Sequence, residues 1–232
     1  MVKEIVTDYD AVSTTSDEID ARKDGKLTRQ IVIDLKDTIR EHNLNALSAI
    51  QIGYDKRIFV INFNGDLKSY VNSFITSAKG FEMSKESDAS IPDKKYILPR
   101  YNTITVVYQT PLGEPKSSQF VGMSAKVFQQ MQDHLEGILI SDLGLEIDED
   151  FENASEEEQA EIVKMYLDSL DIRRQTIEQE ISEDEDLSKL KKNLDIRDKL
   201  ISGEMTITPI KEGDTDSAES KNKKKSNHRN KH

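Results

Sequence analysis

The stretch QQMQDHLEG, residues 129–137, has the spacing of a helix that could hold a metal ion. In a helical H-E-x-x-H pattern, two histidines four residues apart lie on one face and bind zinc, and the glutamate acts as a general base. Here His134 stands at the second histidine, but Gln130 replaces the first histidine and Met131 replaces the glutamate. The pattern indicates the shape of a metal site without its full chemistry.

Two segments have the periodicity of amphipathic helices. Residues 27–42 carry apolar side chains four positions apart, which predicts a helix that covers a sheet. A second helix is predicted to begin with Ser124 as its N-cap and to run to Glu136. Gly137 is expected to end it, because glycine is favoured just after a helix. This second helix carries the motif.

Short strands are predicted between these two helices. The run RIFVINF, residues 57–63, gives the clearest strand signal, and a turn is predicted after it at Asn-Gly-Asp. Further strand candidates, with a Pro-Leu-Gly turn between the last two, are residues 69–75, 95–98, 103–109 and 117–122. We expect an α+β domain with short mixed or antiparallel strands around the motif-bearing helix.

The composition changes along the chain, which has 35% hydrophobic and 33% charged residues. Residues 1–26 are predicted to be an irregular N-terminal arm, and residues 27–144 hold most of the apolar runs and form the predicted domain. Residues 145–211 begin as an acidic linker and continue as charged helices, the first with an N-cap at Ser155. Residues 212–232 are basic and lack the apolar side chains of a core, so we expect disorder there.

Charge and cysteine content exclude some kinds of site. With no cysteine the chain has neither disulfides nor a thiolate ligand, and its formal net charge of −12 argues against DNA binding. No segment approaches the roughly 18 apolar residues that predict a membrane span. We expect no membrane contact and a cytoplasmic location, or host cytoplasm and virion for a viral protein.

Three segments together resemble the signature motifs of the peptide deformylases, metal hydrolases that remove the formyl group from the initiator methionine of nascent chains. They are ALSAIQIG (46–53), ESDASIPD (86–93) and QQMQDHLEG (129–137). The family motifs are G-x-G-[LIV]-A-A-x-Q, E-G-C-L-S and Q-H-E-x-D-H-L-x-G. The resemblance covers roughly residues 25–143. It implies a deformylase-like fold followed by a helical C-terminal extension.

The resemblance also implies that the scaffold of the pocket is retained. Gln51 matches the glutamine whose amide helps to hold the oxyanion, and the N–H of Ala89 matches the other donor. In the first motif Ala46 and Ile50 replace glycine and proline, and Ser48 replaces alanine. We therefore expect the peptide groove to have changed.

At the reacting centre the matching positions have changed type. The Cys, His and His ligands of the family fall on Asp88, Gln130 and His134, and its catalytic glutamate falls on Met131. An amide is a poor ligand, and a carboxylate in place of a thiolate favours hard, weakly held ions. A thioether cannot act as a general acid or base. We expect no catalytic residue and no cofactor, with a weakly bound divalent metal at most.

Plainer roles are predicted for the same side chains. Asp88 and His134 are expected to form a charge-assisted hydrogen bond, and Met131 is expected to fill the core. Asp133 and Glu136 lie on the same helix but do not project from the position of Met131. Replacement of the lost base by either carboxylate is therefore disfavoured.

The favoured hypothesis is an inactive deformylase-like protein that serves as a binding, structural or assembly component. Large tailed phages carry divergent deformylase-like proteins, so a phage particle is one expected setting. Two alternatives stay open: a divergent metal-dependent amide hydrolase that uses Asp88, Gln130 and His134, and a ribosome-associated factor. Protein partners are expected at the C-terminal helices, residues 156–203, and the basic tail is expected to contact an acidic surface or RNA.

Overall fold

The computed structural model describes the fold of residues 1–183 and the side chains of residues 1–170. Its helices are α1 (Tyr9–Val12), α2 (Gly25–His42), the 3-10 turn η1 (Ile50–Ile52), α3 (Met123–Leu135), α4 (Ile140–Leu143), α5 (Glu149–Asn153) and α6 (Glu156–Glu183). Its strands are β1 (Ala46–Ser48), β2 (Ile58–Phe63), β3 (Asp66–Asp88), β4 (Ile91–Gln109), β5 (Pro115–Val121) and β6 (Leu145–Glu146). All described strand pairs are antiparallel, in the order β1-β2-β3-β4-β5, and β6 also pairs with β4.

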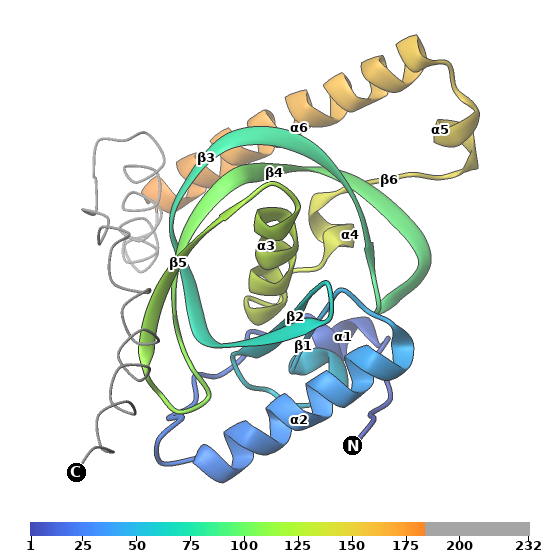
Figure 1. The fold of residues 1–232 in the computed structure, drawn as a ribbon. Coiled ribbons are helices and arrows are strands. Elements are labelled where there is room, and N and C mark those ends of the chain that lie inside the picture. The colour runs from blue at the N-terminus through green and yellow to red at the C-terminus, as the bar shows by residue number, and fades with distance from the viewer. Residues whose placement is uncertain (184–232) are drawn as a thin grey trace, which may run out of the picture.

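The sheet curves around α3, while α2 lies outside it beside β1 and β2 (Figure 1). This arrangement explains why the run RIFVINF is continuously apolar. Along β2, Ile58 and Val60 pack in one cluster with α2, whereas Phe59 and Ile61 pack in a second cluster with α3. Successive side chains of a strand point to opposite faces, so both faces of β2 are buried. The sheet thereby fixes both helices.

Two strands, β3 and β4, are much longer than the sequence predicts. Residues 69–75 and 103–109 are parts of β3 and β4, which have 23 and 19 residues, and residues 95–98 also belong to β4. Gly80 and Pro99 lie inside these strands. Glycine loses more conformational entropy on folding and proline has no N–H for the sheet, so both residues make the sequence look less like a strand. The predicted α+β fold with antiparallel strands around the motif helix is confirmed, and only the predicted lengths of β3 and β4 were too short.

Helix α3 begins differently from the prediction and ends as predicted. Gly122, with φ 64°, stands at the N-cap, and Ser124 lies inside the first turn with its Oγ donating to the carbonyl of Val121. The predicted Ser124 cap was therefore wrong. Gly137 has φ 71°, and the next N–H, of Ile138, donates to the carbonyl of Asp133 at 2.9 Å. This left-handed glycine ends the helix as predicted.

The N-terminal arm packs against the domain. It includes the short helix α1, and its buried apolar side chains are Val12, Ile19 and Ala21. The N–H of Ser16 donates to the carbonyl of Leu135 at 2.9 Å, so the arm also contacts the end of α3. The division of the chain at residues 26 and 144 stays a prediction.

The C-terminal extension begins with two acidic helices. Ser155 caps α6 as predicted: its Oγ accepts from the N–H of Glu158 at 3.3 Å, and the Glu158 carboxylate accepts from the Ser155 N–H at 2.8 Å. The helix continues to Glu183, the last residue whose fold the structure describes. Acidic side chains fill the first turns of α5 and α6, where they interact favourably with the helix dipole.

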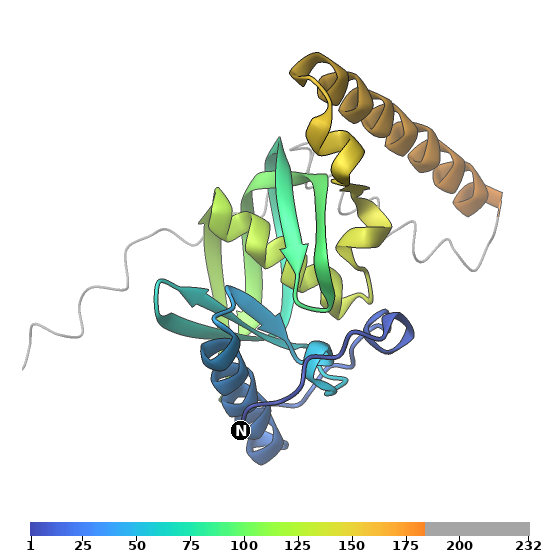
Figure 2. The ribbon, with the colours of Figure 1, turned by 90° about the vertical axis from the view of Figure 1, so that its right-hand side faces the viewer.

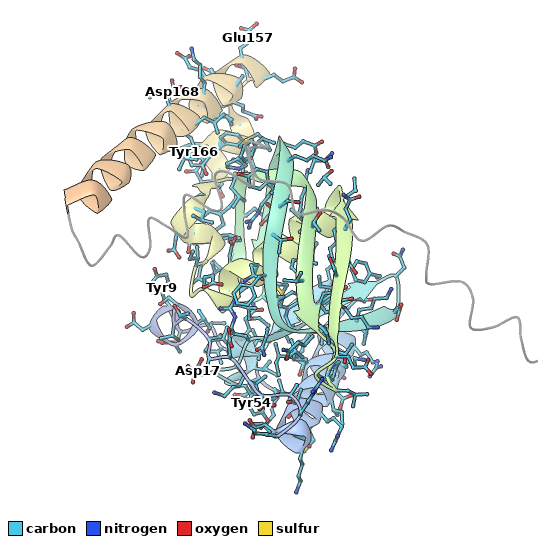
Figure 3. All side chains as sticks on the ribbon, turned by 90° about the vertical axis from the view of Figure 1, so that its left-hand side faces the viewer. Tyr9, Asp17, Tyr54, Glu157, Tyr166 and Asp168 are labelled. Atoms are coloured by element: carbon cyan, nitrogen blue, oxygen red, sulfur yellow. The ribbon has the colours of Figure 1, made fainter. Side chains whose placement is uncertain are left out.

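Helix α6 lies at the end of the molecule opposite α2 (Figure 2). Tyr166 lies on its side nearest the domain, and Glu157 and Asp168 lie on its outer side (Figure 3). The Tyr166 hydroxyl donates to the carbonyl of Leu143 in α4. Among residues 1–183 no helix is long and apolar enough to cross a membrane. The predicted helix up to residue 203 and the predicted disordered tail lie outside the described residues.

Candidate functional site

The three motif segments meet at one point of the fold. The first segment forms β1 and η1, the second forms the turn between β3 and β4, and the third lies on α3. Asp88 is the last residue of β3, Gln51 lies in η1, and Gln130 and His134 lie one helical turn apart on α3. The fold therefore brings the predicted metal positions and the predicted oxyanion glutamine together.

The carboxylate of Asp88 is the centre of this site. Its Oδ2 accepts from His134 Nε2 at 2.6 Å and from Gln130 Nε2 at 3.0 Å. Its Oδ1 accepts from Gln51 Nε2 at 3.0 Å and from the N–H of Ser90 at 2.8 Å. A carboxylate has about four lone-pair positions, so its hydrogen-bonding capacity is filled. The predicted hydrogen bond between Asp88 and His134 is confirmed.

Electrostatics fix the direction of the Asp88–His134 hydrogen bond. Burial alone would raise the pKa of Asp88, but the bond from His134 and the other donors hold this pKa below its ordinary value. The carboxylate is therefore ionised near neutral pH and can only accept, so His134 Nε2 carries the hydrogen. His134 Nδ1 is buried and has no hydrogen-bond partner within the described part of the chain.

The residues at the metal position do not fit a metal ion as they are arranged. In a tetrahedral zinc site, ligand distances of about 2.0–2.2 Å place two donor atoms roughly 3.3 Å apart. The 2.6 Å between Asp88 Oδ2 and His134 Nε2 is a hydrogen-bond distance that leaves no room for a shared ion. Gln130 also points its amide nitrogen, which cannot ligate a metal, toward this carboxylate. Within the described residues no three His, Cys, Asp or Glu side chains form a cluster that could hold a metal.

Met131 is the residue that the motif resemblance places at the family's general base. Its side chain is 2% exposed and belongs to the cluster that α3 forms with the sheet, which includes Phe59 and Phe128. The prediction that Met131 fills the core is confirmed. A thioether in this position accepts no proton near neutral pH.

The nearby carboxylates are bound to buried arginines. Arg100 contacts Glu86 at 2.8 Å and Asp133 at 2.5 Å, and Arg57 contacts Glu136 at 2.6 Å. Both arginine side chains are about 5% exposed or less. Burial raises the pKa of Asp133 in spite of Arg100, while the ion pairs hold the carboxylates of Asp133 and Glu136 against guanidinium groups. These contacts add a physical reason why Asp133 and Glu136 do not replace the lost glutamate.

A cleft of about 420 Å³ opens beside the site. One wall comes from residues 43–46, another from residues 84–89, and the third from the exposed side of α3. Its lining residues include Gln51, Asp88, Ala89, Gln130 and Met131. The cleft is therefore lined by five of the six predicted site positions, the exception being His134.

Sequence reasoning missed two hydroxyl groups of the network. Ser48 donates through its N–H and Oγ to Gln51 Oε1, at 2.9 and 3.1 Å, and Ser90 Oγ accepts from Gln51 Nε2 at 3.2 Å. The replacement of alanine by Ser48 was a signal, but its partner depends on the turn in η1. Ile50, which was expected to change the groove, is buried with 6% exposure. Of the three replaced positions in the first motif, Ala46 is the one that lines the cleft.

Comparisons with known proteins identify the family. The polypeptide deformylase family model matches residues 2–147. The peptide deformylase of Pseudothermotoga lettingae is 33% identical over 117 residues, which cover 50% of this chain and 68% of that protein. The peptide deformylase of Dictyoglomus turgidum is 30% identical over 132 residues, or 56% of this chain and 86% of that protein.

Solved structures agree with this assignment. The structure of a peptide deformylase from Thermotoga maritima has a TM-score of 0.58 and 25% sequence identity, and the match covers 62% of this chain and 97% of that one. The match between the family model and the described domain spans well over half of the chain. By its fold and its sequence, the chain belongs to the polypeptide deformylase family.

Proposed function

We propose that this member of the family does not hydrolyse N-formyl peptides and instead serves as a binding or assembly component. The observation that carries the proposal is the closed hydrogen-bond network of Asp88. All four positions of its carboxylate receive donors of the chain itself, including both Gln130 and His134. A side chain engaged in this way has no lone pair left for a metal ion.

Proton transfer is the second step that the site does not support. Met131 matches the position of the family's base, and the carboxylates of Glu86, Asp133 and Glu136 pair with arginines. Loss of a general acid or base typically reduces a rate by about 10²–10⁴-fold. With both the metal ligands and the base altered, we expect turnover to fall to the background rate.

The protein can still bind a ligand, because the cleft is present. Its walls combine apolar side chains, such as Leu44 and Val127, with the amides of Asn43 and Asn45. Apolar walls with a few polar groups are typical of ligand clefts. We propose that a polypeptide partner is held at this cleft or at the C-terminal extension without being cleaved.

The alternative is a divergent metal-dependent hydrolase. One observation favours it: the three side chains at the family's ligand positions meet at a single atom, Asp88 Oδ2. A metal ion would have to displace the bonds of Gln130 and His134 from this oxygen. The amide of Gln130 would also have to turn over, so that its oxygen faced the ion.

The metal content of purified protein separates the two candidates. We expect elemental mass spectrometry to find no stoichiometric metal in the wild type. A variant with Asp88→Cys, Gln130→His and Met131→Glu should bind about one ion per chain, because thiolate and imidazole suit such metals. The same variant with His134→Ala is the matched control and should lose the ion. A stoichiometric metal in the wild type would favour the hydrolase.

A further inference from the structure

The groups around Asp88 are all donors, and they come from separate parts of the chain. They are the ring of His134 and the amide of Gln130 on α3, the amide of Gln51 in η1, and the N–H of Ser90 in the β3–β4 turn. Their distances to the two carboxylate oxygens lie between 2.6 and 3.0 Å. Such a convergence of N–H groups is what a carboxylate-binding site requires.

Burial distinguishes this arrangement from a surface contact. Exposure is 1% for Gln51 and for His134, and 4% for Ser90. The amide of Gln51 is also oriented by Ser48, whose N–H and Oγ both donate to its Oε1. The orientation of the donor nitrogen is therefore fixed by a neighbouring residue and not by Asp88 alone.

We propose that these donors form a carboxylate-binding site whose ligand is the chain's own Asp88, and that shortening this side chain opens the site to a free small carboxylate. An Asp88→Ala variant keeps Cβ and loses a group of the size of formate. An Asp88→Gly variant also loses Cβ and leaves room for acetate. The ligand class is a small monocarboxylate, matched in size to the atoms removed.

The proposed site has a consequence for any ligand of the cleft. Gln51 Nε2 has two hydrogens, and they are donated to Asp88 Oδ1 and to Ser90 Oγ. With Asp88 in place, Gln51 has no N–H to offer to a carbonyl group in the cleft. This inference concerns the same site as the proposed function and rests on it only in that no metal binds to Asp88.

The test is the effect of small anions on the thermal unfolding of full-length variants. We expect formate to raise the Tm of Asp88→Ala in a saturable manner, because a ligand that binds only the folded state stabilises it. Acetate should raise the Tm of Asp88→Ala less than formate does, and it should raise the Tm of Asp88→Gly more than formate does. Formamide, which is neutral, and chloride at equal ionic strength should have little effect on either variant.

Matched variants separate binding at the site from a general salt effect. The wild type and Asp10→Ala, which changes an exposed aspartate of α1, should not respond specifically to formate. Asp88→Asn fills the same space and should not respond either. Adding Gln130→Ala to Asp88→Ala should weaken the apparent affinity for formate by roughly ten-fold, because one hydrogen bond to a charged ligand is lost.

Each outcome decides the inference. A Tm of Asp88→Ala that responds to formate no more than to chloride would overturn it. If Asp88→Ala is unfolded in plain buffer, recovery of its native circular dichroism on adding formate supports it. If Asp88→Ala stays unfolded in formate while Asp88→Asn is folded, the inference is overturned. The proposed function fails on the metal content of the wild type, so the two failures are distinguishable.

Discussion

At the scale of single residues, Asp88 links three segments that a metal ion joins in the family that the sequence resembles. Its carboxylate receives donors from η1, from the β3–β4 turn and from α3. Its own side chain and that of His134 are each 1% exposed. Removing one donor from a buried carboxylate leaves its charge less well compensated, which costs more than the loss of a neutral hydrogen bond.

We therefore predict a large cost when His134 is removed. The change His134→Ala should lower the free energy of unfolding by about 1.5–3 kcal/mol, because the Asp88 carboxylate stays buried without its shortest hydrogen bond. Urea unfolding monitored by circular dichroism measures this quantity. The matched control is His42→Ala, at the exposed end of α2, which should change it by only about 0.5 kcal/mol.

A double variant tests whether the two residues act as a pair. Because Asp88→Ala and His134→Ala remove the same interaction, their combined cost should be smaller than the sum of the two single costs. Additive costs, or a His134→Ala variant as stable as the His42 control, would contradict a central role for this hydrogen bond.

The positions of the candidate site could be predicted from the sequence, but its contacts could not. The motif resemblance indicated that Asp88, Gln130 and His134 share one site, and residue chemistry indicated a hydrogen bond between the first and the last. The donors Gln51 and Ser90 on the other carboxylate oxygen were not predicted as partners of Asp88. They depend on the geometry of two turns, which residue types alone do not specify.

At the scale of elements, local signals were enough for helices and turns. The α2 periodicity, the left-handed Gly137 and the Ser155 cap each depend on a few neighbouring residues. The lengths of β3 and β4 depend on pairing between distant segments, with register shifts near Asn72 and Thr76. Such pairing carries strands through Gly80 and Pro99, which local propensity alone predicts to be breaks.

The packing of β3 against α3 predicts a pH dependence. Tyr70 is 2% exposed and lies against Phe59, Phe128 and Tyr108. Burial, together with Tyr108 and Asp66, raises the pKa of Tyr70 above its ordinary value. Below a pH of about 10 the tyrosine is neutral in both the folded and the unfolded chain. Above it only the unfolded chain readily ionises, so stability should fall as the pH rises, by up to about 1.4 kcal/mol per pH unit.

Urea unfolding of the wild type and of Tyr70→Phe across the alkaline range measures this effect. The wild type should lose stability more steeply than the variant above a pH of about 10, because phenylalanine cannot ionise. Tyr9→Phe changes an exposed tyrosine of α1, whose hydrogen bond to Asp142 also raises its pKa, and serves as the comparison: it should flatten the slope less than Tyr70→Phe, because Tyr9 is not buried. Equal slopes for Tyr70→Phe and the wild type would show that Tyr70 ionises freely in the folded state.

At the scale of the whole molecule, the sheet, α2 and α3 form the part that the family model matches, and α6 lies beyond it. The bond from the Tyr166 hydroxyl to the carbonyl of Leu143 joins α6 to the domain. Several of the apolar side chains of α6 are half-buried, namely Ile162, Val163, Leu167 and Leu170. We infer that the domain does not depend on α6 for its fold.

A chain that ends at Ala154 tests this inference. It should keep cooperative thermal unfolding. It loses the hydrogen bonds that Gln159 donates to Phe151 and Ala154 as well as the one from Tyr166. Its Tm should fall by roughly 6–12 °C, since each bond is worth about 1 kcal/mol and 1 kcal/mol corresponds to about 2–4 °C in a chain of this size. Tyr166→Phe in the full chain is the control, because it removes the bond to Leu143 and keeps those of Gln159. A truncated chain without a cooperative transition would show that the extension is part of the domain.

The deformylation rate of the purified wild type on an N-formylmethionyl peptide, with divalent metal supplied, tests the central claim most directly. The matched reference is the variant with Asp88→Cys, Gln130→His and Met131→Glu, which restores the family's ligands and base. We predict turnover by this variant and a wild-type rate that is indistinguishable from the rate without protein, a gap of at least about 10²-fold. Wild-type turnover that disappears on His134→Ala would contradict the account, because the site would then be a working hydrolase with altered ligands.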